Sequence, residues 1–201
     1  MATRPVYQFK ISLDCIKPTI WRRIQISDLA TFWDLHVAIQ DTMGWFDCHL
    51  HQFNIKNPLT DKSIRIGIPD PEFDDMLPTE AGWDLKIRDY FTKDKQKCEY
   101  EYDFGDSWGH IIEFEGSKEK DSGKKYPICL DGENACPPED VGGYWGYEDF
   151  VKIMSDDNHE EYDEMFEWFG EKYDPKKFDA SIIKFSNAKR RLNNMLSYNG
   201  I

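Results

Sequence analysis

The stretch EYEYDFGDSWGHIIEF, residues 99–114, decides the fold of this chain. Its first half alternates aromatic and acidic side chains, so Tyr100, Tyr102 and Phe104 are expected on one face of a strand and the acids on the other. Its second half alternates again, after a Gly-Asp-Ser segment that is typical of a turn. We therefore predict a β-hairpin whose three aromatic residues face the core.

The letters DFG in this stretch match the magnesium-binding motif of protein kinases. A kinase also needs a glycine-rich phosphate loop, a strand lysine and an HRD catalytic loop, none of which the chain contains. Asp103, Asp106, Trp108 and His110 are instead candidate binding residues near the hairpin tip. The alternative is a purely structural role, because aspartate side chains commonly bond backbone amides in turns.

The segments around the hairpin predict an α+β fold. Period-two patterns indicate strands in 6–14 and 19–27 around Lys17-Pro18, and in 49–56. A helix is expected from the N-cap Thr31 through Met43. We predict a mainly antiparallel sheet of about five strands, with one helix after the first hairpin and a helical C-terminal part.

Two regions are expected within one structural unit. Residues 1–145 form the sheet domain, with a proline-rich excursion at 57–80 that contains one short β-like run, and a short helix near 85–91. Residues 146–201 have helical periods and are expected to pack on the sheet domain as C-terminal helices.

Composition narrows the class of protein. The chain has 201 residues, 40% of them hydrophobic, without an apolar run of about 18 residues or a signal-peptide segment, so we expect a soluble cytoplasmic protein with no membrane partner. Five cysteines without a CxxC pattern are expected to be reduced thiols. A net charge of −13 disfavours nucleic acid, although residues 1–26 and 181–201 are locally basic.

Arg22 is a local inconsistency in the second predicted strand. It shares a face with Ile20 and Ile24, and a buried charge is costly unless it is paired. We therefore expect either an acidic partner or a ligand for Arg22.

Two further segments supply candidate binding residues. His49 and His51 have an i, i+2 spacing that places two imidazoles on one strand face, but two histidines alone are weak evidence for a metal, and CxxxxxxC is not a usual zinc spacing. Glu139 and Asp140 precede a Gly-Gly pair that could cradle an anion before a helix, but their charge opposes that use. A rigid docking loop is the simpler interpretation, and we expect no metal and no cofactor.

Several motifs together resemble the Ri-plasmid open-reading-frame-three-like family. They are KPTIWRR (17–23), FWDLHVAIQDTMGW (32–45), HLHQF (49–53), YEYDFGDSWGHIIEFE (100–115), YPICLDGENACPPEDVGGYWGYEDF (126–150) and EWFGEKYDPKKFD (167–179). The resemblance implies an α+β domain and an association with plasmids and insertion elements, but no established reaction. Val141 stands where family members often have a cysteine.

Three functional hypotheses follow. The first is a non-catalytic binding or adaptor domain with a protein or small-ligand partner. The second is a metal-dependent hydrolase or nuclease that uses His49, His51, His110 and nearby carboxylates. The third is a DNA-binding accessory factor that uses the basic N-terminal hairpin and residues 189–191.

Overall fold

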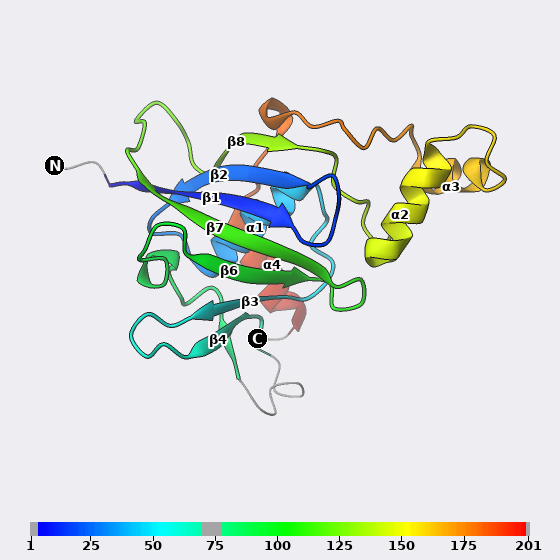
Figure 1. The fold of residues 1–201 in the computed structure, drawn as a ribbon. Coiled ribbons are helices and arrows are strands. Elements are labelled where there is room, and N and C mark those ends of the chain that lie inside the picture. Colours follow the sequence, from blue (N-terminus) through cyan, green and yellow to red (C-terminus); the bar gives the residue numbers. More distant parts are fainter. Residues whose placement is uncertain (1–3, 70–77, 200–201) are drawn as a thin grey trace.

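The computed structural model describes residues 4–69 and 78–199, which form a curved sheet with helices on one face and at one end (Figure 1). Its strands are β1 (Val6–Leu13), β2 (Trp21–Ser27), β3 (His51–Lys56), β4 (Ser63–Gly67), β5 (Thr79–Ala81), β6 (Lys97–Tyr102), β7 (Trp108–Lys118) and β8 (Ile128–Glu133). Its helices are α1 (Phe32–Met43), α2 (Gly143–Met154), α3 (Tyr162–Phe169) and α4 (Ala188–Asn199), with 3₁₀ turns at Ile87–Asp89 and Ala180–Ile182.

The predicted α+β class is confirmed, but the predicted number of strands is too small. The described residues form one eight-stranded sheet in the order β5-β4-β3-β6-β7-β1-β2-β8. Neighbouring strands are antiparallel except for the parallel pair β4–β5. The excursion at 57–80 contributes β4 and the start of β5, while its residues 70–77 lie outside the described residues.

The strands β5 and β8 were missed because pairing, not sequence pattern, creates them. β5 has three residues and lies parallel to β4. β8 lies at the other edge of the sheet and has no buried residue, so it lacks the alternation of a half-buried strand. The two hairpins β1–β2 and β6–β7 are antiparallel, as predicted.

The helix α1 begins and ends at the predicted residues. The Thr31 hydroxyl accepts a hydrogen bond from the Asp34 amide, and the Asp34 carboxylate accepts one from the Thr31 amide, which completes a capping box. Gly44 ends the helix with φ 86°, in the left-handed region that suits glycine. These caps place a mostly buried helix against the sheet.

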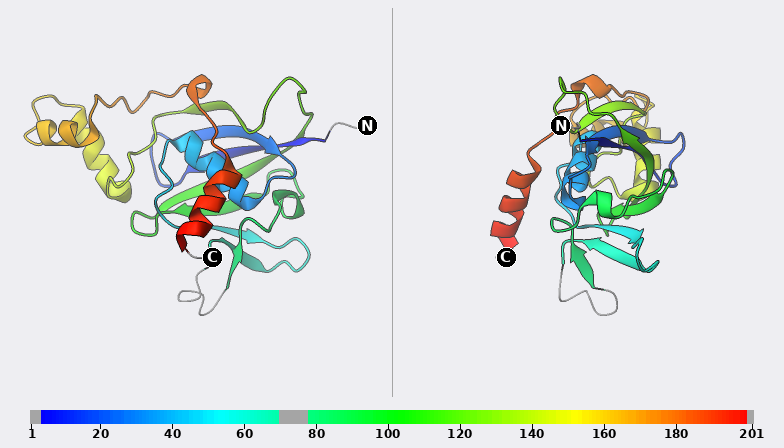
Figure 2. Two further views of the ribbon diagram at one scale, coloured as in Figure 1. Left: turned by 180° about the vertical axis from the view of Figure 1, so that it is seen from behind. Right: turned by 90° about the vertical axis from the view of Figure 1, so that its left-hand side faces the viewer.

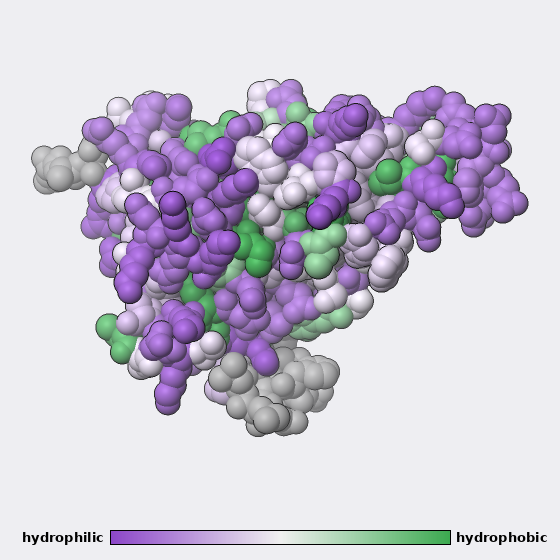
Figure 3. Space-filling model, viewed as in Figure 1, coloured by the Kyte–Doolittle hydropathy of each residue, from purple (hydrophilic) through white to green (hydrophobic). Residues whose placement is uncertain are grey.

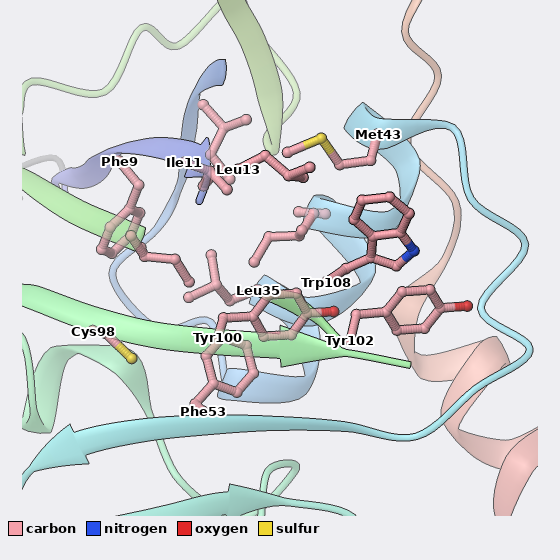
Figure 4. Close-up of a cluster of buried hydrophobic side chains, with 14 of the residues drawn as sticks. Phe9, Ile11, Leu13, Leu35, Met43, Phe53, Cys98, Tyr100, Tyr102 and Trp108 are labelled. Atoms are coloured by element: carbon pink, nitrogen blue, oxygen red, sulfur yellow. The ribbon is translucent and has the colours of Figure 1, made fainter. Parts of the chain in front are cut away.

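The core lies between the sheet and α1. Phe9, Phe53 and Tyr100 are fully or almost fully buried there, and their rings point from three different strands toward the helix (Figure 4). α4 lies on the outer side of α1, so that sheet, α1 and α4 follow one another as layers (Figure 2). The other sheet face carries polar pairs such as Arg23 with Glu115, as expected for an antiparallel sheet that is solvated on one side.

Residues 143–170, which hold α2 and α3 and are called the arm below, project from one end of the sheet. Phe150 is fully buried inside the arm, where its ring contacts those of Phe169 and Tyr173. The arm surface is hydrophilic except for a small hydrophobic patch (Figure 3). Phe150 thus connects the two helices of the arm to Tyr173 just beyond it, and it is continuous with the main hydrophobic core.

Candidate functional site

The tip of the β6–β7 hairpin is a five-residue turn, Asp103–Ser107. Asp103 has φ 57°, and its Oδ1 accepts a hydrogen bond of 2.9 Å from the Gly105 amide. Asp106 Oδ2 accepts one of 3.1 Å from the Gly142 amide, at the start of α2. The turn thus uses both aspartates structurally, and it fastens the hairpin tip to the arm.

Phe104 does not face the core as predicted. β6 ends at Tyr102, and the turn leaves Phe104 49% exposed. The prediction is right for Tyr100 and Tyr102, which are buried, and for the face that His110 and Trp108 share on β7. The strand ends two residues earlier than the alternation to Phe104 suggests, because Asp103 takes a left-handed backbone conformation.

Three ligand-type side chains from distant parts of the sequence meet beside this tip. His49 Nε2 lies 2.9 Å from Asp140 Oδ1 and 3.7 Å from Asp103 Oδ2. One ligand atom from each residue lies within 4.8 Å of the other two. Among the described residues no other group of His, Cys, Asp and Glu meets this criterion, so neither His51 nor the pair Cys129 and Cys136 takes part in one.

Glu139 lies next to this trio but already has two structural partners. Its carboxylate accepts a hydrogen bond from the Tyr102 hydroxyl and one of 2.5 Å from the Phe46 amide. Burial, and then the bond to Glu139, raise the pKa of Tyr102 above its usual range, so this tyrosine is a permanent donor. Glu139 therefore fixes the loop that carries Asp140.

His51 is separated from His49, against the prediction that both share one strand face. β3 begins only at His51, whose ring stacks on that of His36 with a centroid distance of 3.5 Å and an interplanar angle of 7°. Neither ring nitrogen of His51 has a hydrogen-bond partner among the described residues. Burial, with a smaller contribution from His36, lowers the pKa of His51 well below its usual range.

His110 is also a core residue. Its Nδ1–H donates a hydrogen bond of 2.9 Å to the Trp108 carbonyl, and its side chain is almost fully buried. Burial lowers the pKa of His110 to about 4, so the ring is neutral at pH 7. Trp108 itself is buried against Trp45.

Among the described residues, Arg22 is bonded by backbone carbonyl groups and not by the acidic partner that was one of its two expected partners. Its Nε donates to the Thr42 carbonyl at 3.0 Å, in the last turn of α1, and its Nη1 donates to the carbonyls of Trp21 and Glu133. The guanidinium also lies 3.8 Å from the ring centroid of Phe178. Burial lowers the pKa of Arg22, but a cation at the C-terminus of a helix is favourable. Arg22 thus fastens α1 to the sheet.

The candidate residues therefore divide into two groups. Those at the outer end of the sheet come together as one polar cluster: His49, Asp103, Asp106, Glu139 and Asp140. Those in the interior are held by packing or backbone contacts: Arg22, His51, Trp108 and His110. The cluster carries an excess of carboxylates, and burial followed by Glu139, Asp140 and Asp47 raises the pKa of the Cys48 thiol beside it.

The predicted basic patch near the C-terminus is partly neutralised. Arg191 Nη2 lies 2.7 Å from Asp41 Oδ1, and Arg191 Nη1 lies 3.3 Å from Asp47 Oδ2. The first ion pair connects α4 to α1, and the second connects α4 to the segment that follows α1. Lys189 and Arg190 remain as the exposed cations of the 189–191 run. This weakens a phosphate-binding role for the run.

A cleft in the arm is the site that sequence reasoning missed. It has a volume of about 550 Å³ and lies between α2 and α3. Its lining residues are Asp140, Val141, Gly146, Asp149, Phe150, Lys152, Ile153, His159, Glu161, Glu164, Met165 and Trp168. The signal available in the sequence was the aromatic and apolar residues within the acidic segment HEEYDEMFEWFG, where an exposed helical face alone would need none.

His36 was missed as well. Its Nδ1 lies 2.9 Å from the Tyr100 hydroxyl and its Nε2 lies 2.7 Å from Asp47 Oδ1. Since His36 follows Leu35 on the predicted helix, its position beside the apolar stripe was the available signal. His36 thus connects two buried residues, since its ring stacks on that of His51 and is hydrogen-bonded to the Tyr100 hydroxyl.

The fold and these sites define an α+β protein with a polar cluster at one end of its sheet and an acidic helical arm. The chain belongs to the Plasmid pRiA4b ORF-3-like protein family, whose model matches residues 5–181. It is 30% identical over 190 residues to the uncharacterized protein y4hQ of Sinorhizobium fredii. The aligned region covers 94% of this chain and 92% of y4hQ.

A solved structure is similar over nearly the whole chain. It is the crystal structure of MM3350, a protein of unknown function from Methanosarcina mazei Go1. The two structures superpose with a TM-score of 0.84 and 40% sequence identity, over 92% of this chain and 100% of the MM3350 chain. The described residues contain no helix that is long and apolar enough to cross a membrane. Neither similar protein has a described function, so a function must be argued from the sites.

Proposed function

We propose that this protein is a non-catalytic binding module whose arm takes a lysine-rich or arginine-rich segment of a partner protein. The observation that carries this proposal is the cleft between α2 and α3, which combines an acidic rim with apolar walls. A long basic side chain has the matching form, because its alkyl stem packs on apolar surface while its charged end remains near water and carboxylates.

The charge of the arm favours a cationic occupant. Residues 143–170 contain nine acidic residues and one lysine. Asp149, Glu161 and Glu164 line the cleft on its two helices and the segment between them. A phosphate backbone would be repelled by this surface, so nucleic acid is a poor occupant.

The apolar walls give the cleft a second element of recognition. Trp168 is 49% exposed, and its ring meets the ring of the buried Phe150 edge to face at 5.9 Å. An indole held in this way offers a face to an ammonium or guanidinium group. Ile153 and Met165 complete the apolar wall.

A direct test is fluorescence anisotropy with a labelled (Lys-Ala)₄ peptide, in a buffer that contains EDTA. We expect saturable binding that weakens as salt rises, and no saturable binding of the matched (Glu-Ala)₄ peptide. Trp168→Ala is expected to weaken binding about fivefold, the equivalent of roughly 1 kcal/mol. Equal binding of both peptides would contradict the proposal.

A charge-matched pair of double variants controls for the overall field of the protein. Asp149→Asn with Glu164→Gln is expected to weaken binding about tenfold, in line with two partly exposed ion pairs. Glu99→Gln with Glu119→Gln removes the same charge from exposed positions outside the arm and is expected to change affinity less than twofold. Equal losses of peptide affinity in both double variants would show that the overall negative charge of the protein attracts the peptide, and that no defined site binds it.

Competition with spermine separates a protein segment from a free polyamine. We expect spermine, at the same concentration of positive charge, to displace the labelled peptide less well than unlabelled (Lys-Ala)₄. Displacement by spermine at a lower charge concentration would reassign the cleft to small polyamines and would contradict the adaptor role.

A further inference from the structure

We propose that His49, Asp103 and Asp140 bind a divalent transition-metal ion, with zinc or manganese as the fitting class. The site lies where the hairpin tip, the segment before β3 and the loop before α2 meet. The inference stands apart from the proposed function of the arm, because its ligands lie at the base of the arm and only Asp140 also lines the cleft.

The separations of the ligand atoms suit one ion. Two ligands about 2.1 Å from a metal lie about 3.0 to 3.4 Å apart at angles between octahedral and tetrahedral. The observed separations from His49 Nε2 are 2.9 Å to Asp140 Oδ1 and 3.7 Å to Asp103 Oδ2. The third separation, between the ligand oxygens of Asp103 and Asp140, is at most 4.8 Å, so a side-chain adjustment that brings the two carboxylates together would complete the set. An ion would replace the hydrogen bond between His49 and Asp140.

The buried carboxylate of Asp103 is an independent observation that points to a ligand. Asp103 is only 7% exposed, so its charge is largely removed from water. Its Oδ1 is used by the Gly105 amide, while its Oδ2 faces His49 at 3.7 Å, a distance too long for a hydrogen bond. A largely buried carboxylate is stabilised by a nearby positive charge, and a cation at this point would supply one.

The neighbouring contacts hold the three ligands in place. Glu139 is bound by the Tyr102 hydroxyl and the Phe46 amide, and the Gly142 amide is bound by Asp106, so the loop is fixed on both sides of Asp140. Contacts of this kind around the ligands of a metal site reduce the movement needed for coordination. The site is thus prepared by the fold before any ion binds.

The ligand types select the metal. One imidazole nitrogen with two carboxylate oxygens suits zinc or manganese, whereas calcium and magnesium prefer oxygen ligands alone. The His49 side chain is 31% exposed and that of Asp140 is 68% exposed, so solvent can reach the remaining coordination positions. Through Asp140 the ion would also tie the base of the arm to the sheet.

The test is calorimetric titration of EDTA-dialysed, tag-free protein with ZnCl₂ and separately with MnCl₂. We expect one ion per chain and a higher melting temperature in its presence. Asp140→Asn is expected to weaken zinc binding at least tenfold and His49→Gln at least a hundredfold. Asp103→Asn keeps an oxygen that can accept from the Gly105 amide, so a tenfold loss in this variant is attributable to the lost charge.

His159→Gln is the matched control, because His159 lies in the arm close to acidic residues and outside the trio. We expect its zinc affinity to stay within twofold of the unchanged protein. Cobalt(II) provides a second readout, since its visible absorption should change when the imidazole coordinates and should not change in His49→Gln. Absence of binding at 1 mM zinc, or equal binding by all variants, would overturn the proposal.

Discussion

The sheet and the arm use aromatic residues in opposite ways. In the sheet, Phe9, Phe53 and Tyr100 are at most 1% exposed and fill the space under α1. In the arm, Trp145 is 74% exposed and Trp168 is 49% exposed, although the buried Phe150 holds the helices together. The difference shows which aromatic residues the fold needs and which remain available for a partner.

The largest expected effect on the free energy of unfolding comes from the replacement of Arg22, which attaches α1 to the sheet. Arg22→Met removes the donor of hydrogen bonds to the carbonyls of Thr42 at the end of α1, Trp21 on β2 and Glu133 on β8. We expect the free energy of unfolding to fall by about 3 kcal/mol. Urea denaturation followed by circular dichroism measures this change.

The neighbouring arginine is the matched control on the same strand. Arg23 lies on the solvated face and pairs with Glu115 at 2.8 Å, with its side chain 28% exposed. Arg23→Met is expected to cost about 1 kcal/mol or less. Equal losses for the two variants would contradict the assignment of Arg22 to the core and Arg23 to the surface.

A second, smaller effect is a loss of stability in mild acid. The folded-state pKa of His110 is lowered to about 4, below the ordinary unfolded value of about 6.5. The unfolded chain therefore binds a proton first, and the stability contributed by neutral His110 is complete above the unfolded pKa and declines as pH falls toward 4. Between pH 7 and 5 we expect a loss of about 2 kcal/mol from this residue.

Urea denaturation of His110→Gln at pH 7 and pH 5 isolates this contribution. The change in stability between the two pH values should be about 2 kcal/mol smaller than in the unchanged protein, whatever the variant costs at pH 7. A pH dependence that survives in His110→Gln would mean that other groups cause it.

The smallest expected effect on stability is in the arm. Trp168 is half exposed, so Trp168→Ala should lower the free energy of unfolding by less than about 1 kcal/mol, while it weakens peptide binding about fivefold. Melting temperature and anisotropy on the same sample measure both quantities. A large loss of stability would show that Trp168 is needed for folding like the core residues, and would contradict the difference drawn between the sheet and the arm.

The sequence predicted those parts of the fold that local patterns determine. The alternating pattern of residues 99–114 predicted the central hairpin, and Thr31, Asp34 and Gly44 indicated where α1 begins and ends. β8 could not be predicted, because its residues are not buried and its pairing with β2 creates the strand. Local reasoning also placed Phe104 wrongly, since the left-handed turn at Asp103 is not visible in an alternating pattern.

The candidate site was predictable only as a set of separate residues. His49, Asp103 and Asp140 were each candidates, but more than 30 residues separate each from the next along the chain, and only the sheet brings them together. The two histidines that local spacing did pair, His49 and His51, are separated because β3 begins at His51. Arg22 needed a partner as predicted, but carbonyl groups at a helix end are not visible in a strand pattern.

Hydrogen exchange of the protein with and without (Lys-Ala)₄ tests the central claim most directly, namely that the arm is the binding surface and the sheet its support. The amides of residues 143–170 should exchange more slowly with the peptide bound, while those of β6 and β7 should be unchanged. Slower exchange confined to the sheet, or unchanged exchange throughout at saturating peptide, would contradict the account.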